Sequence, residues 1–95
     1  MRNYELMLVI RPTVEEEIRD AQLETVKEII ATDGEVVEVD IWGMRRLAYE
    51  IEKHKEGFYV VIQFKAGVEL PKELDRRLKI SDNVIRHIII NKDEK

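Results

Sequence analysis

The alternation of apolar and polar residues along the chain predicts four strands and two helices. Stretches with a period of two, bounded by turn-forming residues, predict strands at 4–10, 35–51, 58–65 and 84–91. Apolar residues that recur every three or four positions predict helices over about 13–32 and about 70–80. The first strand is apolar on both of its faces, which is typical of a strand at the centre of a sheet.

Residues at the ends of the predicted helices match known capping preferences. Thr13 and Glu16 have the spacing of a capping box, in which each side chain accepts a hydrogen bond from the other residue's backbone amide. Gly34 is expected to end the first helix in a left-handed conformation, and Pro71 suits the first turn of the second helix. The first helix is expected to bury a stripe made of Val14, Ile18, Ala21, Thr25, Val26 and Ile29.

The longest predicted strand is interrupted by Gly43. A glycine inside a strand usually marks a bulge or a close approach of two backbones. A bulge would change the direction of the side chains that follow, including Arg45 and Arg46. The polar stretch 52–57, which ends in glycine, is expected to form the turn to the next strand.

The order strand, helix, strand, strand, helix, strand is that of the α+β, ferredoxin-like βαββαβ fold. Right-handed crossovers place two helices on one face of a four-stranded antiparallel sheet, and 95 residues suit one domain over 1–95 with a polar tail from about 91. The opposite face stays open, and an exposed apolar face usually binds a partner. The side chains expected there are Met7, Val9, Tyr59 and Val61. Trp42 and Met44 join them if the bulge turns the strand that way.

Composition excludes several classes of function. The chain has no cysteine and two histidines, which excludes disulfides and a cysteine nucleophile and argues against zinc. Its first apolar run is too short for a signal peptide or a membrane span, so we expect a cytoplasmic protein without membrane contact. No Ser-His-Asp grouping or paired active carboxylates stand out, so we expect no enzyme, cofactor or small-molecule substrate.

The net charge of −4 hides an uneven distribution along the chain. Residues 15–33 contain seven acids against two bases, whereas residues 76–92 contain five bases against one acid. A phosphate-binding surface depends on whether the bases share one face and not on the total charge. The net charge therefore does not exclude a nucleic-acid partner.

The chain resembles bacterial small-subunit ribosomal protein number six over nearly its whole length, and four segments carry the resemblance. They are the opening 1–5, the stretch 43–51 with the sequence Gly-Met-Arg-Arg-Leu-Ala-Tyr-Glu-Ile, the aromatic strand start 57–59, and 78–86. The stretch 43–51 is the most specific of the four at this length and position. The resemblance implies a protein that binds the central domain of 16S ribosomal RNA together with small-subunit ribosomal protein number eighteen.

Basic residues around the open face are the candidate phosphate contacts. They are Arg2, Arg45, Arg46, Lys53, Lys55, Lys79, Arg86 and Lys92. The candidate contacts for the partner protein, where aromatic residues often anchor an interface, are Trp42, Met44, Tyr59 and Val61. In a regular strand Arg45 and Arg46 point to opposite faces, so at most one need touch RNA, and one could instead pair with a helix acid near Glu28. Tyr4 and Tyr49 are expected to be core residues.

Two alternatives use the same topology. A ligand-sensing regulatory module would dimerise through the same apolar face, and a homodimer without RNA affinity would favour it. The stretch 56–62 also resembles the third strand of the common RNA-recognition module. In that strand Phe58 is expected to face the core and Val60 replaces the second stacking aromatic, so base stacking of that kind is not predicted.

Overall fold

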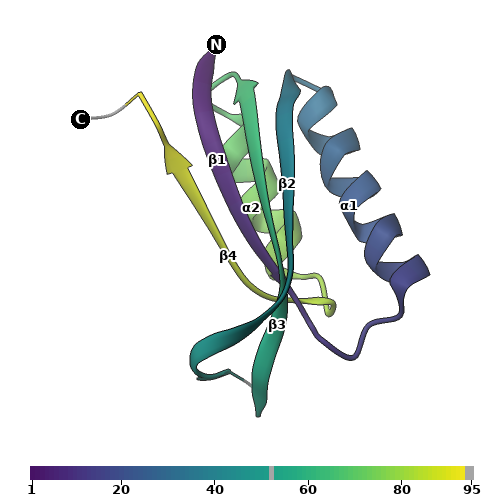
Figure 1. The fold of residues 1–95 in the computed structure, drawn as a ribbon. Coiled ribbons are helices and arrows are strands. Elements are labelled where there is room, and N and C mark those ends of the chain that lie inside the picture. Colours follow the sequence, from purple (N-terminus) through teal and green to yellow (C-terminus); the bar gives the residue numbers. More distant parts are fainter. Residues whose placement is uncertain (52, 94–95) are drawn as a thin grey trace.

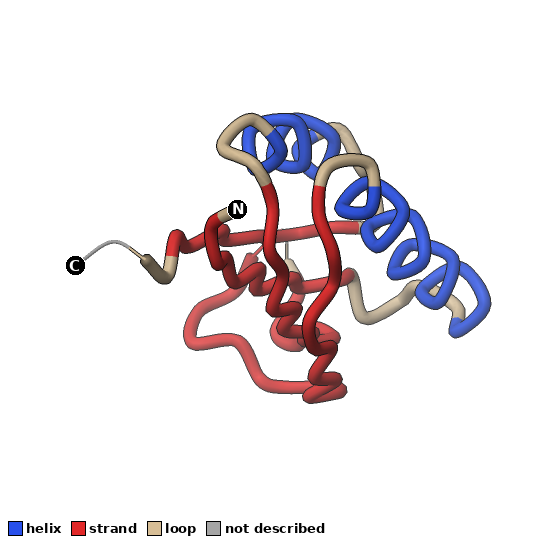
Figure 2. Tube along the Cα trace, turned by 90° about the horizontal axis from the view of Figure 1, so that it is seen from above, coloured by secondary structure: helices blue, strands red, loops and turns tan. Residues whose placement is uncertain are grey.

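The computed structural model describes residues 1–51 and 53–93. Its elements are β1 (Arg2–Ile10), α1 (Glu16–Ala31), β2 (Gly34–Ile51), β3 (His54–Ala66), α2 (Leu70–Lys79) and β4 (Val84–Asn91). The strands form one antiparallel sheet in the order β2-β3-β1-β4 (Figure 1). Figure 2 shows both helices together on one side of the strands. The predicted ferredoxin-like fold is therefore confirmed.

The core lies between the sheet and the helix layer. Alternate residues of the two central strands, β1 and β3, point into it, and the fully buried ones include Leu6, Leu8, Ile10, Val60, Ile62 and Phe64. The second helix closes this core with a leucine every four residues, namely Leu70, Leu74 and Leu78. Because burying each such side chain contributes roughly 1.5–3 kcal/mol, the core fixes which face of the sheet the helices cover.

The predicted start of the first helix is wrong. Helix α1 begins at Glu16 and has no side-chain capping bond, so Thr13 and Glu16 do not form a capping box. The reason is a separate turn before the helix, in which the Val14 amide donates to the Arg11 carbonyl oxygen at 3.3 Å. This turn holds Thr13 away from the first helical turn.

The predicted buried stripe of α1 is only partly correct. The buried side consists of Leu23, Val26, Ile29 and Ile30, whereas three members of the predicted stripe, Ile18, Ala21 and Thr25, are exposed. One turn before Leu23 the core-facing position is taken by Arg19, whose guanidinium carbon lies 3.9 Å from the centre of the Phe58 ring. A cation over an aromatic face is favourable, so a charged residue covers this part of the core.

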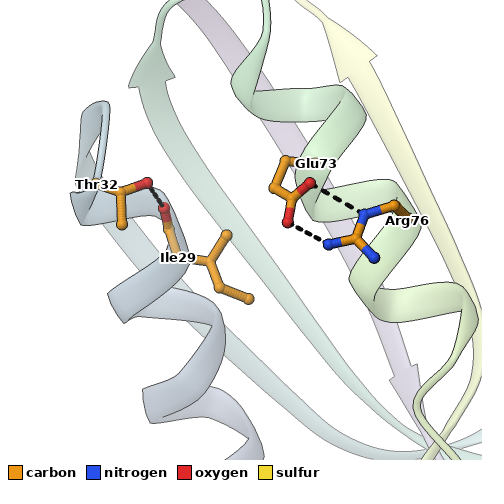
Figure 3. A network of polar contacts seen from close by, with 4 residues as sticks. All are labelled: Ile29, Thr32, Glu73 and Arg76. Carbon is orange, nitrogen blue, oxygen red and sulfur yellow. Dashed lines mark hydrogen bonds and ion pairs between the residues drawn. The ribbon is translucent and has the colours of Figure 1, made fainter.

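Gly34 begins β2 and does not end the helix in a left-handed conformation, which corrects the prediction. The helix ends at Ala31, and the capping residue Thr32 has a right-handed conformation. The Thr32 hydroxyl donates to the Ile29 carbonyl oxygen at 2.6 Å (Figure 3). A Cβ atom on Gly34 would overlap the carbonyl oxygen of Lys65 and lie 2.9 Å from the Cα atom of Ala66. Glycine is therefore required by the close approach of β2 and β3.

The hairpin between β2 and β3 is longer than predicted and its turn is shorter. Ile51 already pairs with His54, and Lys53 has a positive φ of 69°. Glu52, part of the predicted turn, lies outside the described residues. Pairing continues through the polar stretch because both faces of the hairpin are largely exposed at this end, so polar side chains do not interrupt the strands.

Candidate nucleic-acid interface

A bulge at Gly43 directs Trp42 onto the open face, the face of the sheet opposite the helices. The register of β2 against β3 shifts between Ile41 and Gly43, which leaves Trp42 as the extra residue, and Gly43 has a φ of 81°. The ring of Trp42 lies parallel to that of Tyr59, with 6.3 Å between centroids and 8° between planes. Since Tyr59 alternates with the core residue Phe58, both stacked rings lie on the open face, as expected.

Of the four candidate partner contacts, Met44 lies on the other face of the sheet and Val61 is nearly buried on the open face. Met44 pairs with the core-facing residue Phe58, so its side chain belongs to the helix side of the sheet. The bulge shifts the alternation of β2 by one residue, which separates Met44 from Trp42. Val61 does lie on the open face, but it is only 5% exposed and offers little surface to a partner.

Arg45 and Arg46 follow the bulge on an arm that β2 and β3 extend beyond the rest of the sheet (Figure 1). The Nε atom of Arg45 donates to the carbonyl oxygen of Trp42 at 3.3 Å. Both arginines line a hollow with Trp42 and Tyr59, although they alternate along the strand. Neither forms an ion pair with Glu28 or with any other acid in the described part of the chain.

Arg86 of β4 lies on the other side of Tyr59. Its Nη1 atom donates to the hydroxyl of Tyr49 at 2.9 Å, and its guanidinium carbon lies 6.0 Å from the centre of the Tyr49 ring. Tyr49 is exposed, so the prediction that it is a core residue is wrong, whereas Tyr4 is buried as expected. A second hollow, over strands β1, β3 and β4, is lined by Met7, Val9, Tyr59, Arg86 and Ile88. Tyr59 therefore lines both hollows, of which one contains Arg45 and Arg46 and the other contains Arg86.

The remaining cations at this end of the sheet are less closely grouped. Lys53 and Lys55 are exposed at the tip of the arm. The Nζ atom of Lys79 lies 3.0 Å from the carboxylate of Asp75, which also contacts the Nε2 atom of His87 at 2.6 Å. The hydrogen bond from His87, followed by that from Lys79, lowers the pKa of the Asp75 carboxyl group. The charge of Lys79 is thus partly balanced by an ionised neighbour.

Arg2 and Lys92 lie at the opposite end of the sheet. Arg86 is paired beside Val9 of β1, seven residues along the strand from Arg2, which corresponds to about 23 Å. The Nζ atom of Lys92 donates to the side-chain oxygen of Gln63 at 3.0 Å. The separation of about 23 Å between Arg2 and Arg86 exceeds the Debye length of about 8–10 Å in physiological salt. Arg2 and Lys92 therefore form a separate charged region.

Cations on the helices are largely paired with neighbouring acids. Arg76 of α2 forms two hydrogen bonds to the carboxylate of Glu73, at 2.6 and 3.1 Å (Figure 3). This contact lowers the pKa of the Glu73 carboxyl group. On α1, Lys27 pairs with Glu24 at 3.2 Å. The arginines of the open face have no such partners among the described residues, so their charge is available to an external anion.

The described residues contain no cluster of three or more side chains able to hold a metal ion. No helix of residues 1–51 and 53–93 is long and apolar enough to cross a membrane. The open face combines flat aromatic rings, exposed aliphatic side chains and arginines. This combination suits the binding of anionic groups and of flat apolar groups.

Comparison with known proteins agrees with this geometry. The family model of ribosomal protein S6 matches residues 3–91. The small ribosomal subunit protein bS6 of Clostridioides difficile is 59% identical over 90 residues, which cover 95% of this chain and 98% of that protein. The same protein of Desulforamulus reducens is 53% identical over 95 residues, which cover 99% of this chain and 100% of that protein.

A solved structure agrees equally well over the whole fold. The crystal structure of 30S ribosomal protein S6 from Thermotoga maritima matches with a TM-score of 0.91 at 38% identity, covering 96% of this chain and 87% of that chain. These findings confirm the resemblance seen in the sequence. This chain therefore belongs to the ribosomal protein S6 family, a cytoplasmic component of the bacterial small ribosomal subunit.

Proposed function

We propose that this chain is a structural, non-enzymatic protein that binds the central domain of 16S ribosomal RNA together with small-subunit ribosomal protein number eighteen. The observation that carries the proposal is a strip across the open face, made of Met7, Val9, Trp42, Arg45, Arg46, Tyr59, Arg86 and Ile88. We call this set the open-face strip. Its arginines have no acidic partner among the described residues, so phosphate groups can neutralise them.

The two components of the strip suit two different partners. The arginines, extended by Lys53 and Lys55 at the tip of the arm and by Lys79 beside β4, face the RNA backbone. The apolar centre between Tyr59 and Arg86 takes the partner protein, because exposed Ile88 and neighbouring Met7 offer it a dry contact. The separate pair of Arg2 and Lys92 makes a second, smaller phosphate contact.

The partner protein is needed because the chain itself is acidic. Its net charge is −4, so the molecule as a whole carries a negative potential that opposes the approach of RNA. A basic partner seated on the apolar centre makes the joint surface positive. We therefore expect weak RNA binding by the chain alone and tight binding by the pair.

The test is binding of the purified chain to the central domain of 16S ribosomal RNA, with and without protein number eighteen, over a series of salt concentrations. We expect tight binding only with the partner. For each phosphate contact, the logarithm of the binding constant should fall by about 0.7–0.9 for every tenfold increase in salt concentration. A chain that forms a homodimer in sedimentation and binds RNA in neither case would instead be a dimerising regulatory module.

A further inference from the structure

The hollow at the arm end of the open-face strip presents a flat aromatic surface. The rings of Trp42 and Tyr59 are parallel within 8°, and Trp42 is 42% exposed. The indole Nε1 atom donates to the carboxylate of Asp40 at 2.9 Å, which holds the ring in place. Because this bond satisfies the single polar atom of the indole, the exposed surface of the ring requires no further hydrogen bond.

Two guanidinium groups border this aromatic surface. Arg45 is held beside Trp42 by its hydrogen bond to the Trp42 carbonyl oxygen, made through Nε, which leaves both terminal nitrogens available to a ligand. Arg46 lines the same hollow. A basic protein segment would be repelled from this position. A nucleotide matches it, since a nucleotide joins a flat base to an anionic phosphate.

We infer that this hollow is a stacking site for one unpaired nucleotide of the ribosomal RNA, with the base on Trp42 and a phosphate between Arg45 and Arg46. The inference rests on the proposed function and changes the role of Trp42, which the sequence predicted to contact a protein. Because the ring offers only its π surface to the base, the site accepts any base with little preference. It differs from the RNA-recognition module, whose stacking aromatics lie on the two central strands of the sheet, because Trp42 lies on β2.

Trp42 is the only tryptophan of the chain, which makes its fluorescence a direct test. The chain with protein number eighteen is titrated with the central-domain RNA, and the same complex carrying Trp42→Phe serves as the fluorescence blank. We expect RNA to quench the Trp42 emission and protein number eighteen alone to leave it unchanged. Emission that changes with the protein and not with the RNA would assign Trp42 to the protein interface and overturn the inference.

Affinity measurements with matched variants give a second test. Trp42→Leu should weaken RNA binding about tenfold, whereas Trp42→Phe should retain most of the affinity, since base stacking requires an aromatic ring. The salt dependence of Trp42→Leu should equal that of the unaltered chain, because no charge is lost, while R45Q/R46Q should reduce it. Met44→Ala, an exposed side chain just past the bulge on the other side of the sheet, is the control and should bind normally.

The outcomes separate this inference from the proposed function. Normal RNA binding by Trp42→Leu, without quenching of the unaltered chain, would overturn the stacking site and leave the ribosomal function intact. Failure of the unaltered chain to bind RNA under any condition would overturn both. Circular dichroism verifies that Trp42→Leu folds, and if it does not, the quenching experiment and Trp42→Phe still decide.

Discussion

The two halves of β2, before and after Gly43, belong to one strand and behave as different parts of the molecule. The first half packs Val36 and Val39 against the core, and the acids along it are Glu35, Glu38 and Asp40. The second half extends beyond the helices and carries Arg45 and Arg46 on the arm (Figure 1). The bulge thus separates a half that supports the fold from a half that is available for binding.

This comparison also explains why two glycines occur in β2 for different physical reasons. Gly34, in the first half, has no room for a side chain because β3 lies too close. Gly43, at the boundary, has open space around it but a φ of 81°, which L-residues adopt only at a cost. Packing therefore restricts the first half, and backbone conformation restricts the start of the second.

The largest expected effect is on RNA binding by the second half. Reversing the charge of the strip arginines with R45E/R46E/R86E should weaken binding of the chain with its partner by about tenfold per residue, or about a thousandfold in all. The slope of the logarithm of the binding constant against the logarithm of the salt concentration should become smaller by about 2–3, since three phosphate contacts are lost. Filter binding over a salt series measures both.

The matched control reverses three cations on the helix layer, K27E/K72E/R77E, and changes the net charge equally. Because these residues lie away from the strip, RNA binding should fall much less. Equal losses for the two triple variants would mean that total charge decides binding, and the contrast between the halves of β2 would not concern RNA.

The next largest effect should be on stability, in the first half. Gly34→Ala should lower the free energy of unfolding by about 3 kcal/mol, because the new Cβ would overlap the backbone of Lys65, which cannot move without separating β2 from β3. Chemical denaturation measures the loss. RNA affinity of the folded fraction should be unchanged, and a variant as stable as the unaltered chain would show that the strand pair adapts.

A smaller effect should appear at the boundary. Gly43→Ala should cost about 1–2 kcal/mol of unfolding free energy, because alanine is strained at positive φ although nothing lies within 4 Å of its Cβ. Gly43→Asn should cost less, since asparagine tolerates this conformation better. If the bulge straightened instead, stability would be unaffected and Trp42 would leave Tyr59, which a change in tryptophan fluorescence would reveal.

The smallest effect should come from the contact between the arm and β4. Tyr49→Phe removes the hydroxyl that accepts a hydrogen bond from Arg86 but keeps the ring. Because this bond is exposed, the free energy of unfolding should change by less than about 0.5 kcal/mol, and RNA affinity by a few-fold at most. A loss of affinity as large as that of Arg86→Gln would indicate that Tyr49 itself contacts the RNA.

Much of the fold could be predicted from local patterns. The order of the elements follows from alternation in the strands and from the spacing of Leu70, Leu74 and Leu78, and the bulge from Gly43 alone. Two of the errors occur where a distant segment decides the outcome. Arg19 faces the core because Phe58 of β3 lies beneath it, and Gly34 is needed because of the backbone of β3.

The candidate site divides in the same way. The sequence by itself determined the family, the fold and the set of cations, because residue types, their spacing and the order of elements are properties of the chain. Only the tertiary structure decided which cations share a surface. The bulge places Trp42 and Met44 on opposite faces of the sheet, and the strand register separates Arg2 from Arg86. Strand pairing and register bring together residues far apart in sequence, and local periodicity contains no information about those partners.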